Sequence, residues 1–308
     1  MTAPTGAQYR LTLSSSGHEV SAVVTEVAAG IRALEVDGVA LVETFDESRT
    51  PPGAAGIVLV PWPNRVKDGR WMLDGAVQQL DLSEPKQHNA IHGLLRFTGY
   101  RLDVQEAHRV VQTATVFPQH GYPFLLDTSV EHLLSSDGLT VRHRIVNRSE
   151  AAAPVAVGAH PYLALGAVPI DELVLTVDAA TRFLTDENQI PISEERVQGT
   201  DFDLTQGRRI GDLEIDHGFG GVTVTDGRST QSLTAPDGRR VELWADENFG
   251  FVQVFTPRNF AADDGPRRAV AIEPMTAPAD AFNSGEGLRW LEPGETWELE
   301  WGIRYLAA

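Results

Sequence analysis

Tight-turn signals along the chain constrain its fold more than any other feature of the sequence. Seven Asp-Gly pairs occur, and this dipeptide tolerates the positive φ angles that two-residue hairpin turns require. The pairs begin at Asp37, Asp68, Asp74, Asp137, Asp226, Asp237 and Asp264. Several of them separate segments in which apolar and polar residues alternate, such as 131–134 and 139–146. The pattern predicts antiparallel hairpins.

The clearest predicted strand lies near the C-terminus. Trp297, Leu299, Trp301 and Ile303 alternate with glutamate or glycine, which gives this strand one apolar face. Segments 172–178 and 250–255 also have the composition of strands. The sequence therefore predicts an all-β protein built as a large sandwich or barrel.

Helical periodicity is scarce in this chain. It is confined to a short turn near residues 282–288, and the polar stretch 259–268 is expected to be an exposed loop. Neither an internal repeat nor a linker interrupts the sequence, so we expect one domain over residues 1–308.

The composition argues against several classes of function. Lysine and arginine number 25 against 43 aspartates and glutamates, a net charge of −18, which disfavours nucleic-acid and anionic-membrane partners. Cysteine is absent, which excludes disulfides, thiolate nucleophiles and cysteine-ligated metals. The sequence has neither a signal-peptide pattern nor an apolar run of about 18 residues, so we expect a cytoplasmic protein.

The residues that could carry chemistry gather in four segments. Each segment places a functional side chain beside glycine or proline, where rigid irregular backbone often holds binding residues. The segments are 61–65 (PWPNR), 89–96 (NAIHGLLR), 157–162 (VGAHPY) and 272–285 (IEPMTAPADAFNSG).

Two histidines and a glutamate are the candidates for proton transfer and hydrogen bonding. His160 precedes a proline, and a neutral imidazole there could exchange a proton near pH 7, although a structural histidine is the simpler interpretation. His92 could donate a hydrogen bond to a polyhydroxylated ligand or lie in a loop without one. Glu273 ends an apolar run, so burial should raise its pKa towards the range of a general base, unless it is an exposed strand end.

Two further residues have both a functional and a structural interpretation. Asp216 could accept hydrogen bonds from ligand hydroxyls or form a turn. Arg65, beside Asn64, could bind a ligand oxygen or lie on the surface.

Metal binding is not expected. His88 and His92 are four residues apart, a spacing that makes a joint site only on a helix, and Asn89 and Gly93 oppose a helix there. No acidic loop has the ligand spacing of a calcium site, so the acidic excess is interpreted as a solvated surface.

Taken together and in order, these motifs resemble those of the aldose 1-epimerase (galactose mutarotase) family. The resemblance extends from about residue 30 to residue 306 and includes PNR at 63–65, NAIHG at 89–93, GAHPY at 158–162, IDH at 215–217, EPMT at 273–276 and DAFN at 280–283. It implies a large antiparallel β-sandwich with an open sugar-binding cleft, which agrees with the strand pattern.

The resemblance also implies roles for matching residues. Glu273 corresponds to the general base and His160 to the general acid of a reaction that opens and recloses a sugar ring, interconverting its anomers. His92, Arg65 and Asp216 correspond to sugar-binding residues, and Asn64 is a weaker candidate. A monosaccharide would be the partner and no cofactor or metal would be required, while the chain could be a monomer or a homodimer.

The sequence departs from galactose mutarotases at one point. Those proteins usually carry His-Gly-Gly, whereas this chain has HGLLR at 92–96, which is more similar to a bacterial subgroup that includes sulfoquinovose mutarotases. Arg96, Arg65 or Lys67 could therefore bind an anionic group at C6, such as a sulfonate or phosphate, unless Arg96 forms a structural salt bridge. A glycosidase that uses Glu273 with Asp216, or a non-catalytic sugar-binding module, are the alternatives.

Overall fold

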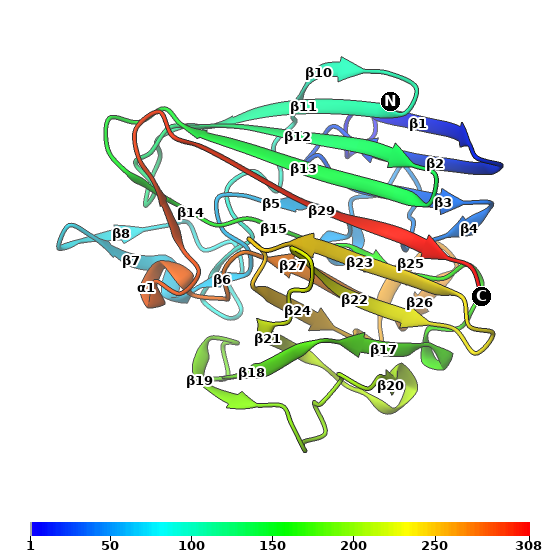
Figure 1. Ribbon diagram of the computed structural model, residues 1–308. Coiled ribbons are helices and arrows are strands. Elements are labelled where there is room, and N and C mark those ends of the chain that lie inside the picture. Colours follow the sequence, from blue (N-terminus) through cyan, green and yellow to red (C-terminus); the bar gives the residue numbers. More distant parts are fainter. Residues whose placement is uncertain (1) are drawn as a thin grey trace.

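The computed structural model describes residues 2–308 as an antiparallel β-structure built from several sheets (Figure 1). Two large sheets and one four-stranded sheet form the body of the molecule, and four two-stranded ribbons connect or cover them. The prediction of an all-β sandwich is confirmed.

The largest sheet has nine strands and extends in Figure 1 from β10 at the top to β17 and β20 near the bottom. Its strands in spatial order are β10 (Arg101–Gln105), β11 (Arg109–Val116), β12 (Leu126–Ser135), β13 (Gly138–Asn147), β29 (Thr296–Leu306), β23 (Arg240–Asp246), β22 (Arg228–Thr234), β17 (Val174–Val177) and β20 (Arg208–Arg209).

The second large sheet has eight strands and supplies part of the candidate site. In spatial order it comprises β19 (Pro191–Arg196), β18 (Ala179–Thr185), β21 (Asp216–Val222), β24 (Phe251–Phe255), β27 (Val270–Met275), β15 (Gly158–Ala159) and β5 (Val58–Leu59), with β16 (Tyr162–Leu163) paired to β27.

The remaining elements are short. The four-stranded sheet contains β1 (Gln8–Ser15), β2 (His18–Thr25), β3 (Ile31–Val36) and β4 (Val39–Ala40). The ribbons pair β14 (Ala153–Val155) with β28 (Arg289–Leu291), β25 (Phe260–Ala262) with β26 (Gly265–Arg267), β6 (Arg65–Val66) with β9 (Ala90–Ile91), and β7 (Arg70–Leu73) with β8 (Ala76–Gln79). The helical segments are η1 (Pro52–Ala54), η2 (Lys67–Gly69), η3 (Ile170–Glu172), η4 (Ile210–Asp212) and α1 (Ala281–Ser284). Within residues 2–308 no helix has the length and apolar character to cross a membrane.

The predicted hairpins form where segments of alternating apolar and polar residues flank an Asp-Gly pair. Ser135 pairs with Gly138 across the turn between β12 and β13, and Leu73 pairs with Ala76 across the turn between β7 and β8. In β29 the residues Trp297, Leu299, Trp301 and Ile303 are all buried, as their alternation predicted. These inward residues anchor β29 between β13 and β23.

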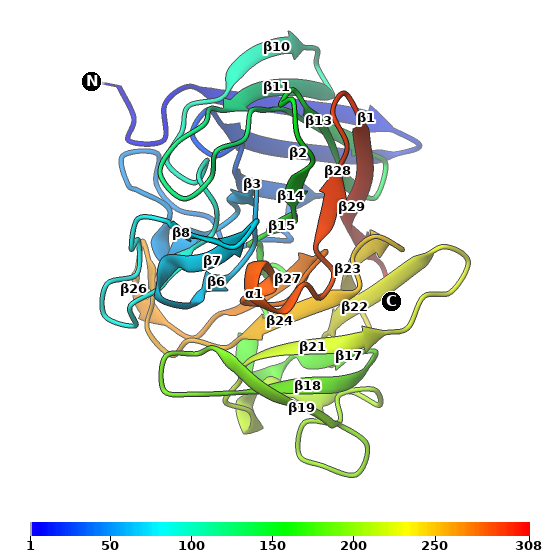
Figure 2. The same cartoon turned by 90° about the vertical axis from the view of Figure 1, so that its left-hand side faces the viewer.

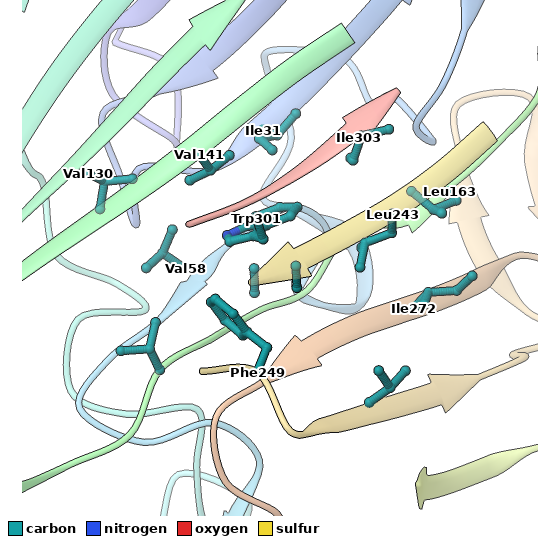
Figure 3. Close-up of a cluster of buried hydrophobic side chains, with 14 of the residues drawn as sticks. Ile31, Val58, Val130, Val141, Leu163, Leu243, Phe249, Ile272, Trp301 and Ile303 are labelled. Carbon is teal, nitrogen blue, oxygen red and sulfur yellow. The ribbon is translucent and has the colours of Figure 1, made fainter. Parts of the chain in front are cut away.

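Apolar side chains fill the space between the sheets (Figure 3). Val130, Val141 and Trp301 from the nine-stranded sheet lie near residues from the other sheets, among them Val58 of β5. Burial of such side chains contributes about 1.5–3 kcal/mol each, which makes this interior the main source of stability.

Two expectations about irregular segments need correction. Residues 259–268 are not simply an exposed loop, because they contain the β25–β26 ribbon, in which Phe260 and Ala262 are buried. Phe260 packs against Tyr162, with ring centroids 4.7 Å apart, so one apolar face is covered although the flanking residues are polar. The predicted helical turn near 282–288 forms slightly earlier, as α1.

Two buried histidines lie inside the nine-stranded sheet. His132 of β12 is fully buried, and neither of its ring nitrogens has a hydrogen-bond partner within residues 2–308. His143 of β13 accepts a hydrogen bond from Trp301 Nε1 at 3.0 Å. Burial lowers the pKa of each histidine to about 3, with the positive charge of His143 also lowering that of His132.

We predict that His132→Leu makes the fold less sensitive to acid. The unfolded histidine has a pKa near 6.5, so between about pH 6.5 and pH 3 the unfolded state binds a proton that the folded state rejects, and stability falls as pH falls. Leucine removes this penalty and leaves no partner unpaired. Urea unfolding at about pH 7 and about pH 5 should show a stability loss smaller by about 2 kcal/mol in the variant. The exposed His120→Leu serves as control, and an equal loss in His132→Leu and the wild type would contradict the prediction.

Candidate functional site

A pocket of about 500 Å³ brings together seven of the candidate residues that the sequence analysis named. It lies where β21, β24 and β27 of the eight-stranded sheet meet the segments around β6, β9 and η1. The predicted residues that line it are Asn64, Arg65, His92, Arg96, His160, Asp216 and Glu273. Other lining residues include Glu84 and Gln253, which the sequence analysis did not identify.

Glu273 and His160 face each other in this pocket. The distance from Glu273 Oε1 to His160 Nε2 is 3.4 Å, and the two residues are 2% and 6% exposed. Glu273 lies in the middle of β27, opposite Gln253 of β24, so it is not an exposed strand end. Its other oxygen, Oε2, has no hydrogen-bond partner within residues 2–308 and is free to accept one from a ligand.

Burial determines the proton content of this pair. It raises the pKa of Glu273 well above the ordinary value, and the negative charge of Asp216 raises it further while Arg65 partly opposes the shift. Burial also lowers the pKa of His160 to about 4. The expectation of a raised pKa for Glu273 is confirmed in direction. Both shifts disfavour the charged forms, so burial favours a protonated Glu273 carboxyl group beside a neutral His160 imidazole.

His160 is held in place by its backbone and by neighbouring rings. Its N–H donates to the Ile57 carbonyl at 3.0 Å, and its carbonyl accepts from the Gly56 N–H at 2.8 Å. Its ring centroid lies 5.3 Å from that of Tyr162 and 5.2 Å from that of His92, which meets it edge-on. These contacts fix the ring position beside Glu273.

His92 occupies a constrained turn rather than a free loop. Its φ angle is 64°, a left-handed backbone conformation that residues other than glycine rarely adopt, and its side chain is buried. Burial and the nearby positive charges lower its pKa well below the usual value, so the ring is neutral. Its buried Nδ1 has no hydrogen-bond partner among residues 2–308.

A hydrogen-bond network runs along another wall of the pocket. Arg65 binds the Glu84 carboxylate through two bonds of 2.8 and 2.9 Å and donates to Asn64 Oδ1 at 3.3 Å. The Asn64 amide donates to Gln253 Oε1 at 3.2 Å, and the Gln253 amide donates to Asp216 Oδ1 at 2.8 Å. Each polar group therefore has a fixed orientation before any ligand arrives.

The structure distinguishes between the functional and the structural interpretations of Asp216 and Arg65. Asp216 begins strand β21, so it does not form a turn, and burial raises its pKa. The side chain of Arg65 is 13% exposed, so it is not a surface arginine.

Of the two residues that the sequence analysis missed, one could have been identified from its sequence context and the other could not. Gln253 is the polar residue inside the apolar run 251–255, and a buried polar group in such a strand requires partners. Glu84 lies in the polar segment 81–89, where nothing in the sequence distinguishes it from its neighbours.

Arg96 differs from Arg65 because it forms no direct ion pair within residues 2–308, although the negative charge of Glu84 acts on it from a greater distance. No carboxylate lies within ion-pair distance of Arg96 in the described part of the chain, so the alternative interpretation of Arg96 as a structural salt bridge is not supported. Its Nη1 donates weakly to the Ile91 carbonyl at 3.4 Å, its guanidinium lies 4.7 Å from the Phe97 ring centroid, and its Nε is buried without a partner. Lys67 is not among the residues lining the pocket and pairs with Asp186 at 3.9 Å.

The donor set does not resemble a metal site. Across residues 2–308 no three histidine or acidic side chains cluster as metal ligands would. His88 and His92 lie outside any helix, on either side of β9. What the pocket offers instead is a buried carboxyl group beside a buried imidazole, together with a set of ordered hydrogen-bond donors and acceptors.

Comparison with known sequences places this arrangement in context. A model of the aldose 1-epimerase family matches residues 9–304. The uncharacterized protein YihR of Escherichia coli strain K12 is 33% identical over 294 residues, which cover 95% of this chain and 92% of that protein.

Solved structures share the fold at lower identity. A putative aldose 1-epimerase from Escherichia coli K12 is 19% identical with a TM-score of 0.81, over 98% of this chain and 100% of the other. A GalM/aldose epimerase homologue from C. elegans is 16% identical with a TM-score of 0.83 over the same shares. A galactose 1-epimerase from Lactobacillus acidophilus NCFM is 17% identical with a TM-score of 0.74, over 97% and 98% of the two chains.

We predict that the His160 ring stays neutral until the solution is strongly acidic. Its ¹⁵N chemical shifts should be those of a neutral imidazole at neutral pH and change with a midpoint of about 4. Glu273→Gln should leave that midpoint in place, because a protonated carboxyl group and an amide are both neutral. His160→Asn identifies the resonance. A midpoint near 6.5, or a clear fall in Glu273→Gln, would show that the carboxylate is ionised and contradict the prediction.

Proposed function

Because the chain belongs to the aldose 1-epimerase family, we propose that it interconverts the α and β anomers of an aldose by opening and reclosing the sugar ring. Glu273 is the general base and His160 the general acid. The observation that carries the proposal is the 3.4 Å approach of these two buried groups in a sugar-sized pocket.

Ring opening requires two proton transfers at neighbouring oxygens. Glu273 takes the proton from the anomeric hydroxyl, His160 gives a proton to the ring oxygen, and the bond between C1 and that oxygen breaks to leave an aldehyde. Rotation about C1–C2 presents the other face of the carbonyl. Reclosure reverses both transfers, so each residue returns to its starting state without a net change of protons.

The protonation state set by burial favours the open-chain stage. When the ring is open, Glu273 carries a proton and His160 is neutral, which is the distribution that burial favours in the pair. The closed sugar needs the opposite distribution, and the short distance between the two groups allows the proton to move between them. Because burial favours the neutral pair also when the closed sugar is bound, the proton must pass from Glu273 to His160 before the ring opens.

The other polar residues provide hydrogen bonds for the sugar hydroxyls. His92, Arg65, Asn64 and Asp216 are proposed as sugar-binding residues, with Gln253 added from the network described above. Their mutual hydrogen bonds orient them in advance, so a bound sugar orders few side chains.

Loss of either proton-transfer residue should remove most of the activity. We predict that Glu273→Gln and His160→Asn each slow anomer exchange by about 10²-fold or more, because each removes one proton-transfer step. Exchange is measured by NMR on D-galactose and D-glucose, and circular dichroism confirms folding. Glu298→Gln and His120→Asn, both at exposed positions, are the matched controls.

The same assay separates the alternatives. Wild-type rates in either variant would reject the assigned roles. Release of reducing sugar from an aryl glycoside would indicate a glycosidase that pairs Glu273 with Asp216. Sugar binding without faster exchange would indicate a non-catalytic binding module.

A second candidate function is supported by Arg96. This arginine has no carboxylate partner in residues 2–308, whereas the charge of Arg65 is neutralised by Glu84. An unpaired guanidinium in a pocket suits a sugar with an anionic group at C6, such as sulfoquinovose or a hexose 6-phosphate.

Substitution of Arg96 tests this substrate class. If the substrate is anionic, Arg96→Gln should raise KM for glucose 6-phosphate or sulfoquinovose at least about tenfold while changing that for glucose little, since an ion-paired hydrogen bond contributes about 1.5–3 kcal/mol. Arg10→Gln, at an exposed position, is the control. Equal effects on neutral and anionic sugars would reject an anionic substrate.

A further inference from the structure

We propose that Asp280 is a positioning residue that fixes the backbone of β6 and thereby the sugar-binding side of the pocket. This inference rests on the proposed function. Asp280 belongs to the DAFN segment, to which the mechanism above gives no role, and it is not among the residues that line the pocket.

Asp280 binds β6 from its open edge. Its backbone N–H donates to the Arg65 carbonyl at 2.6 Å, and its Oδ1 accepts from the Lys67 N–H at 2.9 Å. A carbonyl at one residue and an N–H two residues later point to the same side of a strand, so a single residue contacts both. Asp280 therefore takes the place of a third strand beside the β6–β9 ribbon.

The side chain acts as acceptor because the Asp280 carbonyl is already used. That carbonyl accepts the N–H groups of Asn283 and Ser284 at 2.9 and 3.0 Å, which form the first turn of α1. The Asn283 amide donates to Asp280 Oδ1 at 2.7 Å and to the Arg70 carbonyl at 2.9 Å, which orients the carboxylate. Figures 1 and 2 show α1 beside β6 and β7.

The backbone at Asp280 is itself unusual. Its φ angle is 63°, a left-handed conformation that aspartate, asparagine and glycine tolerate better than other residues. This property separates two effects of substitution, loss of the acceptor and loss of the backbone conformation.

β6 supplies residues on one side of the pocket but neither of the two proton-transfer residues. The Arg65 side chain enters the pocket from this strand, and the preceding Asn64 accepts the His92 N–H through its carbonyl at 2.8 Å. Glu273 belongs to β27, and His160 lies between β15 and β16. Release of β6 should therefore disturb sugar binding more than proton transfer.

Three substitutions of Asp280 separate the contribution of its acceptor oxygen from that of its left-handed backbone conformation. Asp280→Asn keeps both the acceptor oxygen and the backbone preference and should stay within about twofold of wild type. Asp280→Gly keeps the backbone freedom but removes the acceptor, and Asp280→Ala removes both. We expect KM to rise about tenfold or more in the glycine variant and further in the alanine variant, with kcat within about threefold and an unchanged pH profile.

The assay is NMR anomer exchange with whichever of D-galactose, D-glucose and D-glucose 6-phosphate the wild-type protein converts fastest. Asp226→Ala, at an exposed turn with a φ of 51°, controls for loss of a left-handed aspartate elsewhere. Thermal unfolding of each variant identifies losses that come from instability alone. If Asp280→Gly does not fold, Asn283→Ala replaces it and should raise KM in the same direction.

Three results would overturn the proposal. They are a wild-type KM in Asp280→Gly or its replacement, a fall in kcat with KM unchanged, and a loss in Asp280→Asn equal to that in Asp280→Gly. If the wild-type protein accelerates no anomer exchange, the proposed function fails instead, and the role of Asp280 is then judged from the dissociation constants of these sugars measured by NMR titration.

Discussion

The rest of the site depends on the burial of an acid beside an imidazole. Glu273 and His160 are removed from water by β27 and by the irregular segment after β15, and both lose their preference for the charged form. In water these groups would exist as carboxylate and partly protonated imidazole. Inside the protein they lie 3.4 Å apart, and burial raises the pKa of Glu273 and lowers that of His160, so both charged forms are disfavoured. The sandwich supplies the rigid walls that keep the two groups together.

Much of this architecture can be predicted from the chain alone. Alternation fixes which face of β29 is buried, and Asp-Gly turns mark the β7–β8 and β12–β13 hairpins, because both depend on neighbouring residues. The site residues could be named because they lie in short motifs with a family resemblance, and Asn64, His92, His160 and Glu273 also stand directly beside glycine or proline. Their convergence in one pocket depends on long-range strand pairing, which local patterns do not contain.

The features that escaped prediction depend on partners distant in sequence. Glu84 acquires its importance from Arg65, 19 residues away, and Gln253 from Asn64, 189 residues away. The segment 259–268 is polar in composition, yet Phe260 finds a covered position against Tyr162. In each case the contact depends on residues that the fold brings together from distant parts of the sequence, so neighbouring residues alone do not predict it.

The ion pair between Arg65 and Glu84 has a consequence for how the pocket discriminates among ligands. A ligand that bound both sides of the Arg65 guanidinium would leave the partly buried Glu84 carboxylate without its counter-ion. Glu84 thus competes with any ligand for Arg65, which leaves Arg65 suited to uncharged hydroxyl groups. One glutamate in the wall of the pocket therefore limits how much of the Arg65 charge a ligand can use.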